Sequence, residues 1–523
     1  MKDKKKNRRE FLKTGLGGLA AVVLMENVKA ENINPLTDEI HADLRETTIA
    51  DLQAKMKSGE LTARRITEMY LERIREIDPK LRSVIEINPD ALAIADALDK
   101  ERKKGKVRSA LHGIPVLIKD NIDTADKMHT TAGSLALLDA PVPQEDAFIV
   151  KRLRRAGAVV LGKTNLSEWA NFRGQKSISG WSGRGGQTNN VYYLDRNPCG
   201  SSAGSGVAVS ANLAAVAVGT ETNGSIICPS LRNGVVGIKP TLGLVSRSGI
   251  IPIAHTQDTA GPMARTVADA AILLGALGGR DKNDSETTDA DKKGAKDYTK
   301  FLDADGFRGA RIGIAMQFSD NAESKEFIKP ILEMMRAGGA TLVDVRFPFD
   351  YGKISDDRLE VLLYEFKTDL NKYLAARGTK NKTLADLIKF NDENKDRELA
   401  LFGQELFLEA EKRGALTDKK YLDALLKVKR AAREEGIDAV LASDKLDAIC
   451  APTSGQTWAI AATAGYPYIT VPAGFKDNPL GLSFFGRPFS EPLLIKYAYA
   501  FEQKTKARRV PEYLPTAPKP PAQ

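Results

Sequence analysis

Lys119 stands where a lysine can act as a base, at the end of a predicted strand. It follows the apolar residues 115–118 (Pro-Val-Leu-Ile), a short run that indicates a buried strand. Burial disfavours the charged form of an amine, and a neutral lysine is a competent general base. The same position also suits a lysine whose amine reaches solvent at the sheet edge. The spacing makes Lys119 a candidate base and leaves the surface alternative open.

Two Gly-rich segments supply candidate nucleophiles. Residues 199–206 (CGSSAGSG) contain Ser201 and Ser202, and residues 219–226 (GTETNGSI) contain Ser225. Turns of this composition let the backbone approach a ligand closely and aim several N–H groups at one point. Such donors could hold the oxyanion of an acyl-transfer reaction. Each segment by itself also fits an ordinary tight turn whose serine caps a helix.

Other catalytic chemistry finds little support in the sequence. A serine nucleophile usually relies on a histidine base, but no histidine stands in a recognisable catalytic setting and no Gly-x-Ser-x-Gly elbow joins a strand to a helix. The four histidines are His41, His112, His129 and His255. No His-x-x-x-His pattern and no paired cysteine motif offers a metal site. We therefore expect no metal and a base other than histidine.

Residues 157–164 (GAVVLGKT) match the P-loop pattern letter for letter. A P-loop holds phosphate with backbone N–H groups of middle residues that lie in an open loop. Here the middle residues, 158–161, are Ala-Val-Val-Leu and predict the interior of a strand. We therefore expect no nucleotide at this segment.

The first thirty residues have the layout of an export signal. A basic stretch precedes the apolar residues 15–25, and a small-residue site ends at Ala30. Arg8 and Arg9 with the following Glu-Phe-Leu-Lys resemble a twin-arginine (Tat) signal, the route for proteins exported after folding. A disordered basic tail is the alternative. We expect a periplasmic or extracellular protein that is exported by the Tat machinery. We exclude residues 1–30 from the fold.

The rest of the chain is close to electrical balance. The 523 residues include 77 Lys and Arg against 68 Asp and Glu, a formal net charge of +9. Residues 1–30 carry eight basic and three acidic side chains, which leaves 69 against 65, or +4. That charge gives little reason to expect a nucleic acid partner. No apolar run reaches the ~18 residues of a membrane span, so we expect no stable membrane anchor.

The three cysteines predict no disulfide framework. They are Cys199, Cys228 and Cys450. Their number is odd and their positions are scattered. Export after folding also removes the need for oxidative cross-links.

Strands that alternate with helices predict an α/β fold with both faces of the sheet covered. Helices are expected over residues 48–100, 146–156, 205–218 and, in a charged region that could cap one edge, 355–440. Short apolar runs predict strands at residues 113–119, 158–161, 235–238, 311–315, 340–345, 448–451, 468–471 and 480–485. Residues 173–200 are expected to form an irregular loop, 280–300 a surface excursion, and the final PTAPKPPAQ a loose tail.

Six ordered segments resemble the amidase signature family. They are residues 113–120 (GIPVLIKD), 162–169 (GKTNLSEW), 198–206 (PCGSSAGSG), 219–226 (GTETNGSI), 235–241 (VVGIKPT) and 258–269 (DTAGPMARTVAD). The resemblance extends from about residue 45 to about 505. It implies one large α/β domain, 31–510, with a central mixed sheet covered by helices on both faces. The signature core would span about 110–270, the helical cap region about 355–440, and a C-terminal tail 511–523.

The resemblance implies a Ser-cisSer-Lys triad without a cofactor. Lys119 matches the family lysine, Ser201 the serine beside a cis peptide bond, and Ser225 the nucleophile. Ser202 would support the proton relay by hydrogen bonding.

The resemblance also implies an oxyanion hole. It would consist of the backbone N–H groups of Thr222, Asn223, Gly224 and Ser225. Many family members have glycine where this chain has Asn223, which puts the width of the hole in question, although asparagine tolerates left-handed backbone angles.

The implied activity is amide hydrolysis with release of ammonia. Residues 179–186, 196–202 and the Glu-Thr-x-Gly-Ser variant look most like bacterial peptide amidases, which act on C-terminal peptide amides. Loop 123–145 and the helical region 355–440 are expected to line the acyl pocket. One alternative is the A-type subunit of a tRNA-dependent amidotransferase, against which the leader argues. Another is a non-catalytic amide-binding protein, which the complete triad disfavours. The sequence gives no prediction of oligomeric state.

Overall fold

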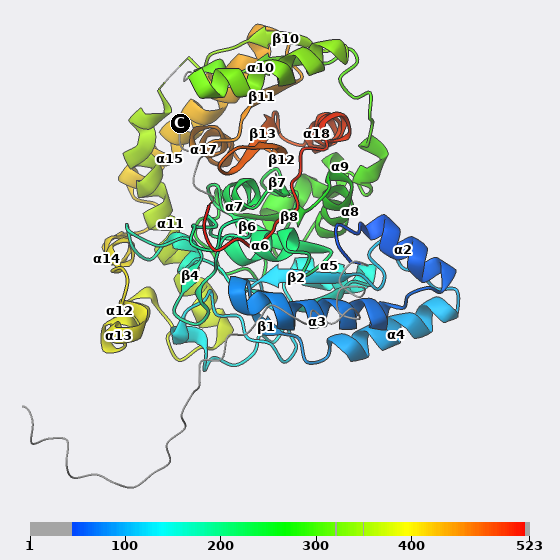
Figure 1. The fold of residues 1–523 in the computed structure, drawn as a ribbon. Helices are drawn as coiled ribbons and strands as arrows, with labels where there is room; N and C mark the ends of the chain where they lie inside the picture. The colour runs from blue at the N-terminus through cyan, green and yellow to red at the C-terminus, as the bar shows by residue number, and fades with distance from the viewer. Residues whose placement is uncertain (1–43, 319–321, 349, 518–523) are drawn as a thin grey trace, which may run out of the picture. The chain divides into compact units, whose positions relative to one another are not determined.

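The structure, a computed structural model, describes residues 44–318, 322–348 and 350–517 (Figure 1). These residues belong to one unit, Asp43–Gln523. The predicted export signal at 1–30 lies outside the described residues. Within the described residues, no helix is both long and apolar enough to span a bilayer.

A mixed sheet runs through the described residues and confirms the predicted fold class. Its eleven strands lie in the order β1-β3-β2-β6-β8-β7-β12-β13-β11-β9-β10. They are β1 (Val84–Ile87), β2 (Pro115–Lys119), β3 (Val159–Thr164), β6 (Val216–Glu221), β7 (Val236–Lys239), β8 (Thr259–Ala264), β9 (Arg311–Ile314), β10 (Thr341–Asp344), β11 (Ala448–Pro452), β12 (Tyr468–Phe475) and β13 (Pro479–Phe485). The neighbours β3-β2-β6 and β11-β9-β10 pair in parallel, and the other neighbours are antiparallel. The short strands β4 (Trp181–Ser182) and β5 (Gly186–Gln187) form a separate pair.

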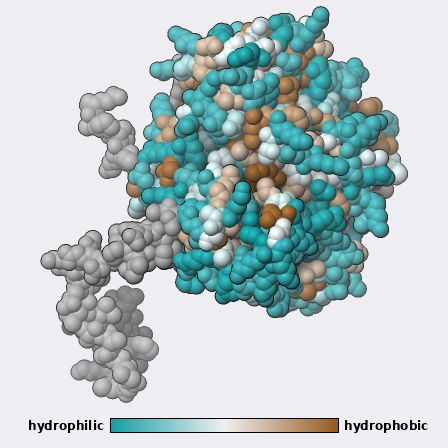
Figure 2. All heavy atoms as spheres, turned by 90° about the vertical axis from the view of Figure 1, so that its right-hand side faces the viewer, coloured by the Kyte–Doolittle hydropathy of each residue, from teal (hydrophilic) through white to brown (hydrophobic). Residues whose placement is uncertain are grey.

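Helices cover both faces of this sheet (Figure 1). α5, α8 and α18 form one layer, and α6 and α7 pack together on the opposite face. The helices outside the cap are α2 (Ile49–Ser58), α3 (Ala63–Leu81), α4 (Ala91–Lys103), α5 (Phe148–Ala156), α6 (Ala203–Ser210), α7 (Ile227–Arg232), α8 (Val267–Leu277), α9 (Ala290–Lys293), α10 (Ala322–Ala337), α17 (Gly455–Ala464) and α18 (Glu491–Thr505). Because of this cover, every residue of β2, β3 and β6 is buried. The face in Figure 2 is largely hydrophilic, with apolar side chains in small patches.

The charged region after residue 350 is helical, as predicted, and packs over one end of the sheet. Its helices are α11 (Ser355–Arg377), α12 (Leu384–Glu393), α13 (Lys395–Glu398), α14 (Glu405–Glu411), α15 (Lys419–Ala432) and α16 (Asp438–Ser443). We call these six helices the cap. Its apolar side chains join those of Trp169, Phe172, Ile251 and Ile253 in one cluster, where the rings of Phe172 and Phe366 lie 4.9 Å apart. The cap therefore rests on two loops of the signature core.

A buried ion pair also ties the cap to the core. The guanidinium of Arg173 contacts the carboxylates of Glu168 and, at 3.4 Å, Glu398. It also lies 4.1 Å from the centre of the Phe402 ring. All three side chains are fully buried, and burial together with the nearby Glu398 carboxylate raises the pKa of Glu168. Removing Arg173 would leave two buried carboxyl groups without a cation.

The predicted helix over 205–218 is wrong in its second half. α6 ends at Ser210 and β6 begins at Val216. Asn212 takes a left-handed φ of 58°, and Arg73 donates hydrogen bonds to the carbonyls of Ala211 and Asn212. A buried cation thus satisfies the carbonyls at the helix end. Sequence periodicity alone could not show this distant partner.

Three further differences concern short elements. The predicted helical stretch 48–100 is wrong at β1, residues 84–87, which form a strand beside β3. The strand β8 was not predicted, because its residues have no apolar run of strand length. The predicted loose tail, residues 515–523, is attached to the core at its first residue, because the carbonyl of Pro515 accepts from the N–H of Asp195 at 3.2 Å. Leu514, just before it, exchanges backbone hydrogen bonds with Tyr192 and Leu194. Residues 518–523 lie outside the described residues.

Candidate active site

Lys119 ends β2 inside the protein and not at its surface. Its amine lies 2.7 Å from Oγ of Ser201, 2.8 Å from Oγ1 of Thr220 and 3.3 Å from the Thr220 carbonyl. The side chain is fully buried. β2 pairs in parallel with β6, and this pairing brings Thr220 beside the end of β2. The alternative of a lysine that reaches solvent does not hold.

Burial lowers the pKa of Lys119 to about 7. Desolvation is the main cause, because a charged amine loses its hydration in the interior. The carboxylates of Asp258 and Glu221 act in the opposite direction and partly offset the effect. Near neutral pH a large fraction of Lys119 is therefore neutral and can accept a proton.

Ser201 and Ser202 precede the first turn of α6. The Gly200–Ser201 peptide bond is cis, as the family resemblance implies. Oγ of Ser202 donates to the carbonyl of Thr220 at 3.0 Å and accepts from its N–H at 3.1 Å. The N–H of Ser202 donates to the carbonyl of Ser225 at 3.0 Å. Ser202 therefore ties the segment of Ser201 to both the lysine side and the Ser225 side of the site.

Residues 222–225 form a turn between β6 and α7. Gly224 has a left-handed φ of +86°, and Asn223 does not share this conformation. The asparagine that this chain has at position 223, where many family members have glycine, therefore does not need a left-handed backbone conformation. A Cβ atom at Gly224 would lie 2.4 Å from Nε1 of Trp458, so this close approach requires glycine. The structure places the four predicted oxyanion donors on one turn, and their catalytic role stays a prediction.

Two buried carboxylates hold this turn in place. Glu221 accepts from the N–H groups of Ile226 (2.7 Å) and Ile227 (3.0 Å) at the start of α7. Asp258 accepts from the hydroxyl of Thr222 at 2.5 Å. Burial raises the pKa of Asp258 to about 6 and also raises the pKa of Glu221. Sequence reasoning did not single out these residues, nor Thr220, because only the fold brings them to Lys119.

A cavity of about 280 Å³ opens beside Thr220 and Thr222. Loop residues 250–253, His255 and Asp258 form one wall, and Asp369, Lys372, Tyr373 and Ala376 of α11 form another. That this cavity is the acyl pocket stays a prediction, and the helical region lines it. Loop 123–145 does not; Asp123 and residues 143–145 line a neighbouring cavity of about 400 Å³.

His255 links the cap to the loop that carries Asp258. Its Nδ1 lies 2.7 Å from Asp369 and 3.6 Å from Glu365, and these three side chains could together offer ligands to a metal ion. However, Glu365 already accepts from the Tyr421 hydroxyl (2.8 Å) and from Thr256 (3.0 Å). These bonds favour a structural connection between the loop and α11.

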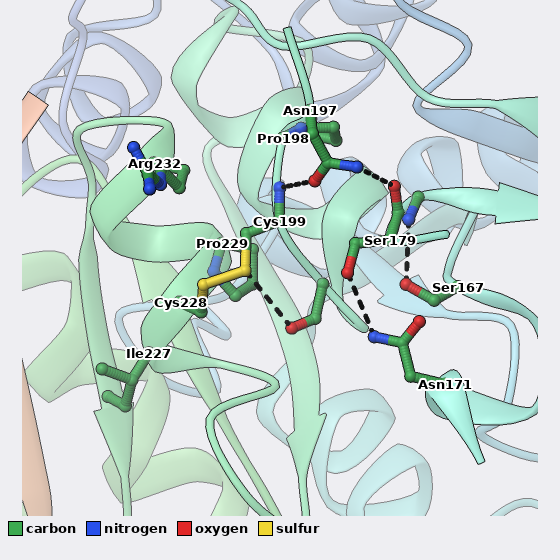
Figure 3. Close-up of a disulfide and its surroundings, with 12 residues drawn as sticks. Ser167, Asn171, Ser179, Asn197, Pro198, Cys199, Ile227, Cys228, Pro229 and Arg232 are labelled. Carbon is green, nitrogen blue, oxygen red and sulfur yellow. Dashed lines mark hydrogen bonds between the residues drawn. A yellow bond between two sulfur atoms is a disulfide. The ribbon is translucent and has the colours of Figure 1, made fainter. Parts of the chain in front are cut away.

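The expectation of no disulfide is wrong. Cys199 and Cys228 form a disulfide with a Cα–Cα distance of 5.8 Å, although 29 positions separate them (Figure 3). The fold brings them together because the turn after β6 returns α7 to the loop before Ser201. Cys450 is a free, buried thiol. The odd number of cysteines therefore did not exclude one bonded pair with Cys450 left over.

Solved structures resemble this chain closely in sequence and fold. Native peptide amidase from Stenotrophomonas maltophilia is 51% identical with a TM-score of 0.86. The match covers 90% of this chain and 99% of that one.

Curated relatives agree with this likeness. "Probable amidase At4g34880" of Arabidopsis thaliana is 43% identical over 90% of this chain and 92% of its own length. The A-type subunit of glutamyl-tRNA(Gln) amidotransferase from Thermoanaerobacter pseudethanolicus is 34% identical over 90% of this chain and 99% of its own length. The Amidase family model matches residues 65–460, most of the chain. The chain therefore belongs to the amidase family and is a hydrolase that acts on amide C–N bonds.

Proposed function

We propose that the enzyme hydrolyses its substrate through a Ser225 acyl-enzyme, with Lys119 as the base and Ser201 as the relay. The contact that carries this proposal is the 2.7 Å distance between the buried amine of Lys119 and Oγ of Ser201. A neutral amine at this distance can take the hydroxyl proton, whereas a charged one cannot. The lowered pKa of Lys119, about 7, supports the neutral form.

In the first half-reaction, Lys119 accepts the Ser201 proton and Ser201 accepts the Ser225 proton. Oγ of Ser225 then bonds to the carbonyl carbon, and backbone N–H groups of the 222–225 turn stabilise the oxyanion. The C–N bond breaks as the relayed proton reaches the nitrogen, so that ammonia leaves instead of an amide anion. Water then attacks the ester carbonyl and gives a proton to the same relay. The relay returns this proton to Oγ of Ser225 as the ester C–O bond breaks and the carboxylic acid leaves. Ser202 keeps the relay segment in place through its bonds to Thr220 and Ser225.

The proposed substrate is a peptide with a C-terminal amide. The 51% identity to peptide amidase supports this class, as does a cavity that both polar and apolar residues line. The second candidate is glutamine hydrolysis as the A-type subunit of an amidotransferase, because a relative with that name is 34% identical. The leader at residues 1–30 favours the first, since a tRNA-dependent partner would be cytosolic.

Ammonia release from matched substrates tests the reaction. We expect wild-type enzyme to release ammonia from peptide amides faster than from glutamine or simple aliphatic amides. A fluorophosphonate probe should label the wild type and fail to label Ser225→Ala. Labelling that persists in the variant, or glutamine as the best substrate, would contradict the proposal.

We propose that the protein is exported by the twin-arginine route to the periplasm or beyond. The three-part leader supports this route, and a disulfide suits an oxidising compartment. Changing Arg8 and Arg9 together to lysine should leave active enzyme in the cytoplasmic fraction. Normal export of that variant would contradict the route.

A further inference from the structure

A covalent bond joins the two segments that carry the proposed relay and nucleophile. Cys199 stands two residues before Ser201, and Cys228 stands three residues after Ser225. Their disulfide connects the loop before the cis peptide bond to the first turn of α7 (Figure 3). Neither segment can move away from the other while this bond is intact.

The carboxamide of Asn233 makes a second link between the same two segments. Its Nδ2 donates to the carbonyl of Pro198 at 3.0 Å and to the carbonyl of Pro229 at 2.8 Å. Each proline is the chain neighbour of one of the bonded cysteines. Asn233 is fully buried, so water does not compete for these hydrogen bonds.

The relay loop is fixed on its other side as well. Asn197 accepts from the N–H of Cys199 at 2.8 Å and donates to the carbonyl of Ser179 at 3.0 Å (Figure 3). The carbonyl of Ser201 accepts from the N–H of Ser167 at 3.0 Å. The loop before α6 belongs to no strand of the sheet. Its position therefore depends on cross-links of this kind and not on a hydrogen-bonded ladder.

We propose that Cys199, Cys228 and Asn233 are positioning residues, which form a double clamp that sets Ser201 against Ser225. Proton transfer between two hydroxyls requires a separation of about 2.6–3.2 Å. A displacement of about 1 Å can slow a reaction by about 100-fold. A covalent and a hydrogen-bonded link at the same place restrict that displacement together. This inference rests on the proposed function, since the clamp matters only if both serines act.

Reversible reduction of the folded enzyme tests the clamp. Cys199 and Cys228 are partly exposed and Cys450 is buried, so a small reductant can reach the disulfide. Dithiothreitol would convert the disulfide to two thiols and become a cyclic disulfide itself. A Cys450→Ala background removes the third cysteine. Alkylation and mass measurement should then count no thiol before reduction and two after it.

We expect reduction to lower kcat about tenfold and to change KM less than about twofold, because displaced serines affect the chemical step more than binding. Removal of the reductant and reoxidation with oxidised glutathione should restore kcat. The double variant Cys199→Ser with Cys228→Ser should have the kcat of the reduced enzyme, and dithiothreitol should not change that kcat. Asn233→Ala alone should lower kcat by about threefold, and reduction of that variant should cost more than the product of the two effects.

Two results would overturn the clamp. One is a kcat within about twofold of the oxidised value when two thiols are counted. The other is a loss of kcat that follows the unfolded fraction measured by circular dichroism, since that would be a stability effect alone. Ser225→Ala in the oxidised background separates the two proposals. If that variant is active, the proposed function fails; if it is inactive while reduction changes nothing, only the clamp fails.

Discussion

The signature core and the cap position their residues in different ways. In the core, the fully buried strands β2 and β6 end at the site. Their parallel pairing places Lys119 near Thr220 and Glu221. In the cap, α11 presents Asp369, Lys372 and Tyr373 to the cavity from a helix far away in the chain. In the proposed mechanism, the core therefore carries the reacting groups, and α11 of the cap lines the cavity for the rest of the substrate. We expect substitutions in the two regions to separate kcat from KM.

The largest effect should follow removal of the base. Lys119→Met keeps the length and burial of the side chain but cannot accept a proton from Ser201. We expect kcat to fall by about 10⁴-fold or more, in the range seen when a catalytic unit loses one member. Ammonia release measures the change, and circular dichroism checks the fold. A well-folded Lys119→Met enzyme with more than a tenth of normal kcat would remove the lysine from the mechanism.

A smaller effect should follow acidification. The pKa of Lys119 is about 7, so below that pH the amine holds its proton and cannot act as a base. We expect kcat to fall about tenfold per pH unit below 7 and to level off above it. Asp258→Asn should move this fall to lower pH, because the Asp258 carboxylate favours the charged amine. A pH profile that is flat from 5 to 9 would contradict a lysine base.

A change in the cap should act on binding. The Tyr373 hydroxyl donates to Asp123 at 2.8 Å, and this bond joins α11 to the core beside the cavity. Tyr373→Phe should raise KM about fivefold, the equivalent of about 1 kcal/mol for one hydrogen bond, with kcat nearly unchanged. Tyr364→Phe is the matched control, because its hydroxyl donates to Asp418 within the cap. Equal changes of KM in both variants, or a change confined to kcat, would contradict the division between core and cap.

The smallest effect should come from Lys372, an exposed side chain at the rim of the cavity. Lys372→Ala should raise KM about two- to threefold for acidic peptide amides and leave neutral ones unchanged. Because the charge is exposed, added salt should weaken this difference. The ratio of KM values at low and high salt measures it, and an equal change for neutral substrates would rule out a charge effect.

Much of the core could be predicted from sequence because its motifs are local. Lys119 ends an apolar strand, and Ser201 and Ser225 lie in Gly-rich segments that adjoin buried elements. The cap was predicted as helical, but no local pattern says that Asp369 meets His255 or that Tyr373 meets Asp123. The helix end at Ser210 was missed for the same reason, since Arg73 comes from a distant helix. The disulfide was missed because the argument concerned cysteine number and export, not the return of α7 to the relay loop.

The position of the cap in the chain order has an evolutionary consequence. The chain enters the cap after β10, the outermost strand of the sheet, and returns from the cap to β11. Only β9 lies between β10 and β11 in the sheet. Both ends of this insertion are therefore at one margin of the sheet, distant in strand order from β2 and β6. In the proposed mechanism, substitutions on the cavity side of α11 would alter substrate preference while the strands that carry the reacting groups keep their order. Loss of the whole cap would also remove Glu398 from the buried cluster around Arg173. Under the proposed function, this arrangement would allow new specificities to arise while the relay of Lys119, Ser201 and Ser225 is inherited intact.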